Sequence, residues 1–94
     1  MYYVITCRDK PDSLPIRLDN RDAHLAGLKT LGPRVLTAGP LLGPGETDMV
    51  GSLLIIEFAD RPAAEDFVRN DPYNRAGLFE NVDIQPWRKV IPTD

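Results

Sequence analysis

The chain has 94 residues, of which 43% are apolar and 27% charged, and its formal net charge is −3. That length predicts a single domain over residues 1–94, and the acidic balance without a basic run argues against nucleic acid as a partner. No apolar run approaches the roughly 20 residues that span a bilayer. The first residues lack the features of a signal peptide, so we expect a cytoplasmic protein without membrane contact.

Residues that commonly hold metals or act as nucleophiles are scarce. Cys7 is the only cysteine and His24 the only histidine. A disulfide within the chain, a cysteine-based zinc cluster and a multi-histidine metal site are therefore excluded. The sequence has no glycine-rich phosphate loop and no serine or cysteine in a nucleophile elbow. We expect neither a metal nor a cofactor.

Strands and helices alternate along the chain. Gly32-Pro33 closes the first helix, and the second helix ends before Pro72. The order βαββαβ predicts a ferredoxin-like α+β fold, in which the first and third strands are central in a four-stranded antiparallel sheet and both helices cover one face. The predicted elements are a strand at 2–8, a helix at 16–31, strands at 35–41 and 52–59, a helix after the N-cap Asp60, and a last strand at 82–91 interrupted by Pro86.

The central strands carry apolar side chains on both faces. In the third strand Leu54 and Ile56 share one face, whereas Leu53 and Ile55 share the other. Two helices cover only one face, and a sheet face that meets water is expected to be polar. The pattern favours a homodimer in which a second copy covers the open face; the alternative is a shallow apolar face that stays exposed.

Polar residues share the apolar stripe of the first helix. At about 100° per residue, Arg17, Arg21 and His24 fall beside the leucines expected to face the core. Cationic and titratable groups aimed at a core face a pocket or a buried partner. The alternatives are a buried, hydrogen-bonded histidine without catalytic role and arginines whose stems cover the helix edge. The leucines of this stripe are Leu18, Leu25, Leu28 and Leu31.

Asp71 is a second candidate. Asp71 before Pro72 is a typical N-cap and first-turn pair, which predicts a short turn over residues 73–77. Capping alone would explain the residue. The two roles are compatible, because one carboxylate oxygen can cap while the other holds an imidazole.

Segments along nearly the whole chain resemble the YciI-like (YCII-related) family. They are Arg17-Leu18 with Arg21 and Ala23-His24-Leu25, Leu36-Thr37-Ala38-Gly39-Pro40, Gly51-Ser52, Asp71-Pro72-Tyr73 with Ala76-Gly77, and Pro86-Trp87-Arg88-Lys89-Val90. The resemblance implies a ferredoxin-like fold in a dimeric α+β barrel-like assembly. It also implies that His24 and Asp71 meet as a catalytic pair, with polar site positions at Arg21, Ser52 and Tyr73. The loop at 41–50 looks shorter than in many relatives.

Two functions follow from this pattern. The first is a cofactor-independent lyase or isomerase in which His24 is the general acid or base and Asp71 orients it. Its reaction would be proton transfer, isomerisation or elimination on a small cyclic or anionic substrate. The alternative is a non-catalytic small-ligand-binding or accessory module that uses the same cleft. Only the enzyme requires one free nitrogen on His24. The side chains expected to bind the substrate are Arg17, Arg21, Ser52 and Tyr73.

Overall fold

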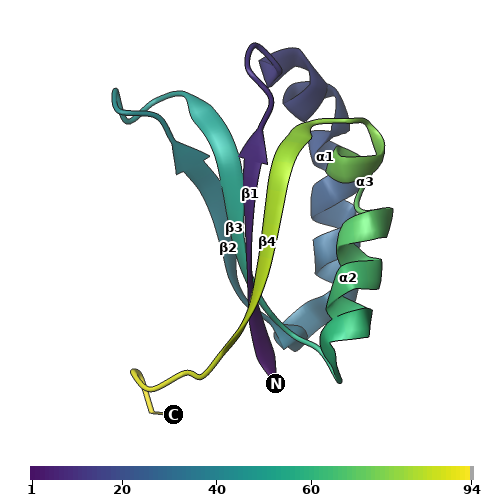
Figure 1. Cartoon of the computed structure of the whole chain (residues 1–94), viewed down its shortest axis with the longest axis vertical. Coiled ribbons are helices and arrows are strands. Elements are labelled where there is room, and N and C mark those ends of the chain that lie inside the picture. The colour runs from purple at the N-terminus through teal and green to yellow at the C-terminus, as the bar shows by residue number, and fades with distance from the viewer. Residues whose placement is uncertain (94) are drawn as a thin grey trace.

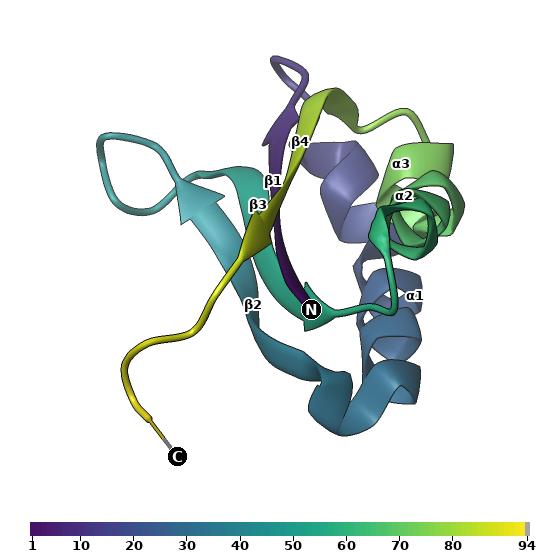
Figure 2. The ribbon, with the colours of Figure 1, turned by 60° about the horizontal axis from the view of Figure 1, so that its bottom comes forward.

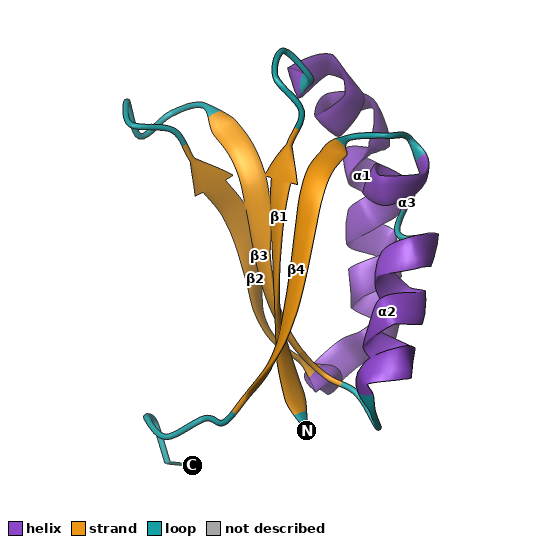
Figure 3. Ribbon diagram, in the orientation of Figure 1, coloured by secondary structure: helices purple, strands orange, loops and turns teal. Residues whose placement is uncertain are grey.

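The computed structural model of the chain describes residues 1–93. Its four strands form one antiparallel sheet in the order β2-β3-β1-β4, and the helices pack against one face of it (Figure 1; Figure 3). The predicted ferredoxin-like α+β fold is thereby confirmed. The elements are β1 (Tyr2–Asp9), α1 (Leu14–Leu31), the short 3-10 helix η1 (Gly32–Arg34), β2 (Val35–Leu42), β3 (Met49–Glu57), α2 (Arg61–Asn70), α3 (Pro72–Arg75) and β4 (Phe79–Trp87).

The core lies between the sheet and the helices. Ile5 of β1 pairs with Leu54 of β3 on one side and with Ile84 of β4 on the other, so the three side chains share the helix-facing side of the sheet. Alternation along the strand directs every second residue of β1 to this side. The buried apolar residues are Tyr3, Ile5, Cys7, Leu28, Leu54, Ile56, Phe58, Ala64, Val68, Tyr73, Leu78 and Phe79.

The opposite face of the sheet has no helix over it (Figure 2). Val4 pairs with Ile55 and is flanked by Leu53, and all three side chains are half-buried. Tyr2 and Trp87 meet edge to face on this side, with ring centroids 5.9 Å apart. A single subunit therefore presents apolar side chains here, as the strand pattern predicts.

The buried face of α1 is narrower than the predicted stripe. Leu18 and Leu25 are 52% and 38% exposed, so their assignment to the core of the subunit is wrong. Arg17, His24 and Leu28, which were placed on the same stripe, are buried as expected, at 3%, 6% and 8% exposure. The stripe was drawn too wide because leucines were counted as core, whereas partners for Arg17 and His24 determine which part of it the fold buries.

Three element boundaries also differ. Helix α1 begins at Leu14 with Pro15 in its first turn, and β3 begins at Met49 and not at residue 52. Strand β4 spans Phe79–Trp87 and continues through Pro86, which was expected to interrupt it. Because β4 is an edge strand that pairs only with β1, a proline there leaves no hydrogen bond to an outer neighbour unmade.

Gly51 brings β3 unusually close to β1. A Cβ atom at this position would lie 2.2 Å from the carbonyl oxygen of Cys7, which no real side chain tolerates. The absence of a side chain thus permits the strands to approach where β3 begins to be buried. The next residue, Ser52, pairs with Cys7 and by strand alternation lies on the helix-facing side with Leu54.

Side-chain caps fix the two helices that follow β3. The Asp60 carboxylate accepts a hydrogen bond of 2.9 Å from the backbone N–H of Ala63 and begins α2. Asp71 ends α2 and caps α3, which packs against α1. No helix within residues 1–93 is both long and apolar enough to cross a membrane.

Candidate active site

His24 and Asp71 meet in the interior. Nδ1 of His24 lies 2.8 Å from Oδ1 of Asp71, and both residues are buried. The same Oδ1 accepts the backbone N–H of Tyr73 at 3.2 Å. The two roles of Asp71 are therefore compatible, as expected, although one carboxylate oxygen with two lone pairs fills both and not one oxygen each.

The second ring nitrogen of His24 is unoccupied by protein. Among residues 1–93, Nε2 has no hydrogen-bond partner, and no side-chain nitrogen or oxygen sealed from solvent lacks one. Nε2 therefore keeps access to open space. The carboxylate acceptor places the ring proton on Nδ1, and Nε2 is then the basic nitrogen.

Tyr73 lies against both basic groups of the site. Its ring stacks on the His24 imidazole at a centroid distance of 4.0 Å and an interplanar angle of 17°. The guanidinium carbon of Arg17 lies 4.8 Å from the centroid of the same ring. Burial raises the pKa of Tyr73, and the charges of Arg17 and Arg21 offset this only in part. The phenol consequently stays protonated and can donate a hydrogen bond.

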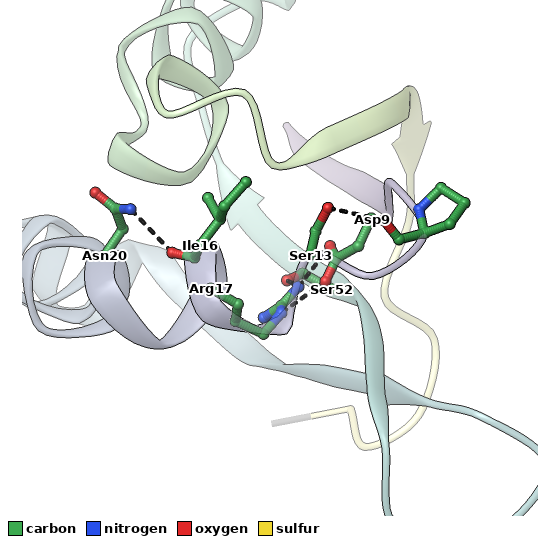
Figure 4. A network of polar contacts seen from close by, with 7 residues as sticks. Asp9, Ser13, Ile16, Arg17, Asn20 and Ser52 are labelled. Carbon is green, nitrogen blue, oxygen red and sulfur yellow. Dashed lines mark hydrogen bonds and ion pairs between the residues drawn. The ribbon is translucent and has the colours of Figure 1, made fainter.

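Arg17 is held by a buried network (Figure 4). Its Nε and Nη2 atoms each donate to an Asp9 carboxylate oxygen at 2.8 Å, and Nη2 also donates to Oγ of Ser52 at 3.0 Å. Burial alone would lower the pKa of Arg17, but the hydrogen bonds and charge of Asp9 outweigh it, so the pKa is raised. Arg17 and Ser52 are thus engaged with protein partners.

Sequence reasoning did not single out Asp9. It stands at the end of β1, where nothing in the local pattern marks a functional residue. A usable signal existed on α1, because an arginine predicted to face the core requires a buried anionic partner. The position of that partner depends on the tertiary fold.

Arg21 differs from Arg17 in being exposed and unengaged. Within residues 1–93 it makes no ion pair or side-chain hydrogen bond, yet it lines the same cavity as His24. Its guanidinium is therefore available to an anionic ligand at the mouth of that cavity.

Two cavities flank His24. The α1–β2 cavity, about 210 Å³, is bounded by Arg21, His24, Pro40, Ser52 and Tyr73, among others. The α1–α2 cavity, about 390 Å³, lies on the side of Asp71. Its polar side chains other than His24 and Asp71 all bond within the protein, whereas the α1–β2 cavity has the unengaged guanidinium of Arg21. Those bonded side chains are Thr30, Arg34, Asp66 and Asn70.

Cys7 lies in the core beside this site. Burial, followed by the negative charges of Asp71 and Asp9, raises the pKa of the thiol from 9.0 to about 12. A thiol that stays protonated is a poor nucleophile, so Cys7 contributes packing and not covalent chemistry. Within the part of the chain that the structure describes, no group of three or more His, Cys, Asp or Glu side chains is placed to hold a metal ion.

Known proteins resemble this chain over nearly its whole length. The model of the YCII-related domain family matches residues 1–88. The chain belongs to the YCII-related domain family. Protein YciI of Escherichia coli O6:H1 is 44% identical over 98 residues, which cover 97% of this chain and 100% of that protein. A Haemophilus influenzae protein is 42% identical over the same shares.

Solved structures also resemble this chain. The 5-chloro-2-hydroxyhydroquinone dehydrochlorinase of Burkholderia phenoliruptrix AC1100, in complex with 2,5-dihydroxybenzoquinone, is 39% identical to this chain. It superposes with a TM-score of 0.91 over 100% of both chains. An antibiotic biosynthesis monooxygenase, 18% identical with a TM-score of 0.58 over 96% of this chain and 99% of its own, shares the fold alone.

Proposed function

We propose that this YCII-related protein is a cofactor-independent acid/base enzyme of the lyase or isomerase type. The observation that carries the proposal is the state of His24: buried, held at Nδ1 by Asp71, and open at Nε2. A histidine tied to protein through both nitrogens would favour a purely structural role. The ring edge that bears Nε2 points away from Asp71, and we place the substrate on that side, in the α1–β2 cavity.

The chemistry begins with proton transfer. Nε2 of His24 accepts a proton from a hydroxyl or carbon of the substrate, and the Asp71 carboxylate stabilises the resulting imidazolium. The electron pair left behind becomes a new double bond. In an elimination it expels a leaving group together with its bonding electrons; in an isomerisation His24 returns the proton to another atom. Arg21 faces the oxygen on which negative charge develops.

The hydroxyl-bearing residues complete the proposed site. The phenol of Tyr73 is protonated and can donate to a ligand oxygen, and the Ser52 hydroxyl, which already accepts from Arg17, can donate in the same way. Arg17 was predicted to bind substrate directly. Its engagement with Asp9 favours a supporting role, in which it fixes Ser52 and Tyr73 at the cavity wall.

A relative's named substrate supplies a direct test. The purified protein, pretreated with a chelator, is incubated with 5-chloro-2-hydroxyhydroquinone, and chloride release is followed against a reaction without protein. We expect release that saturates with substrate concentration. Saturable binding of 2,5-dihydroxybenzoquinone without any turnover of this or related hydroxylated rings and lactones would support the alternative, a non-catalytic ligand-binding module.

Arg21 allows a test of ligand charge. Replacing it with lysine keeps the positive charge but removes the planar fork that matches an anionic oxygen pair. We expect Arg21→Lys to weaken binding of 2,5-dihydroxybenzoquinone by about tenfold, which corresponds to roughly 1.4 kcal/mol, measured by calorimetry. Arg69→Lys, the same change at an exposed pair on α2, is the control. Equal affinities for both variants would remove Arg21 from the site.

We also propose that the protein is a homodimer joined through the open face of the sheet. The apolar side chains of Val4, Leu53 and Ile55 on that face support it. Ile55→Glu should reduce both the sedimenting mass at micromolar protein and the melting temperature, because small subunits gain stability from their partner. Ala26→Glu, on the exposed side of α1, is the matched control. A monomeric wild type would exclude this assembly.

A further inference from the structure

The hydrogen bond to Asp71 does not by itself fix the orientation of His24. The bond at Nδ1 restrains one edge of the imidazole, but small coupled changes in χ1 and χ2 can still tilt the ring plane while the bond is kept. The direction in which Nε2 points depends on that tilt. A second contact is therefore needed if Nε2 is to meet a substrate atom in a constant geometry.

Tyr73 supplies this contact. Its ring is nearly parallel to the imidazole, at 17° and a centroid distance of 4.0 Å, so rocking of either ring would cause a clash or lose the stack. Tyr73 is itself 2% exposed, with Phe79 edge to face at 6.1 Å and the Arg17 guanidinium over its ring. A side chain packed on several sides is a firm support for His24.

The two contacts to His24 come from one short turn. Asp71 and Tyr73 flank Pro72, whose ring fixes its backbone φ angle, and the Tyr73 N–H donates to the same Asp71 oxygen that holds Nδ1. Three consecutive residues therefore set the position of the Asp71 carboxylate, which binds the edge of the imidazole, relative to the Tyr73 ring, which stacks on its face. The Asp9–Arg17 pair supports the far end of this unit.

We propose that the ring of Tyr73 is a positioning residue for His24, distinct from any hydrogen bond its hydroxyl makes to substrate. The proposal rests on the proposed function for its kinetic consequence. Its geometric consequence, a single orientation and tautomer of His24, does not require turnover. The two parts of Tyr73 then affect different kinetic constants: loss of the hydroxyl raises KM, and loss of the ring lowers kcat.

Three substitutions separate the two parts. Tyr73→Phe keeps the ring and removes the hydroxyl, whereas Tyr73→Leu and Tyr73→Met remove both. The methionine variant is included because its flexible side chain fills irregular space if the leucine variant fails to fold. We expect Tyr73→Phe to raise KM with kcat within about threefold of the wild type. The leucine and methionine variants should lose a further 10- to 100-fold in kcat, about the cost of misplacing a reacting group by 1 Å.

Nuclear magnetic resonance provides a readout without substrate. His24 is the only histidine in the chain, so its imidazole ¹⁵N signals need no assignment. Wild type and Tyr73→Phe should show one Nδ1–H tautomer with slow exchange of that proton with water, whereas the leucine and methionine variants should show mixed tautomers or faster exchange. Identical spectra and kcat values in all four proteins would overturn the proposal. If the spectra differ among the four proteins as expected but the wild type shows no turnover, the result counts against the proposed enzymatic function and not against the positioning role of Tyr73.

Discussion

Replacing His24 with alanine is expected to lower turnover by about 10²–10⁴-fold, the usual contribution of a positioned general acid or base. The substitution removes the only histidine of the chain, whose side chain lines both cavities and whose Nε2 has no protein partner within residues 1–93. Chloride release from 5-chloro-2-hydroxyhydroquinone is the measurement. The melting temperature and sedimenting mass of the variant show whether the fold and assembly survive.

Asp71→Asn distinguishes orientation of His24 from helix capping. Asparagine is as good an N-cap as aspartate, so α3 should remain intact. The amide lacks the negative charge that stabilises an imidazolium and can donate to Nδ1, which would favour the wrong tautomer of His24. We therefore expect a loss of activity comparable with that of His24→Ala and little loss of stability. Full activity in Asp71→Asn would leave Asp71 as a cap only.

The parts of the fold set by local chemistry could be predicted from the sequence. Strand alternation, the Asp60 cap and the Gly32-Pro33 stop depend on neighbouring residues, and the structure has each where it was expected. The contact between His24 and Asp71 also occurs, although it spans 47 positions of sequence. Family resemblance made that contact predictable. The helical pattern alone indicated only that His24 faces the interior, and it said nothing of the position of Asp71.

The remaining features depend on long-range packing. Exposed Leu18 and Leu25 could not be told from core leucines, because helical periodicity does not say which side of α1 meets the sheet. Asp9 was missed for a different reason: it lies only eight positions before Arg17, but the turn from β1 into α1 that brings the two side chains together has no recognisable sequence signal. Buried polar networks such as this one are satisfied across the fold, and their members need not share a local motif.

The Asp9–Arg17 pair carries the largest expected effect on stability. Its side chains are 6% and 3% exposed, and both carboxylate oxygens of Asp9 accept from the guanidinium. Removing one member of a buried pair leaves the other charge uncompensated, which typically costs about 3–5 kcal/mol. That is a large share of the roughly 5–15 kcal/mol by which such domains are stable.

Asp9→Ala should therefore lower the free energy of unfolding by about 3–5 kcal/mol in urea titrations. Asp66→Ala removes a carboxylate from an exposed pair with Arg69 on α2 and should change stability little. The double variant Asp9→Ala/Arg17→Met removes both charges while an apolar chain fills much of the space, so it should recover most of the loss. Equal effects of Asp9→Ala and Asp66→Ala would mean that water screens the Arg17 charge once its partner is gone. That outcome would contradict the expectation that loss of Asp9 leaves a buried, uncompensated charge on Arg17.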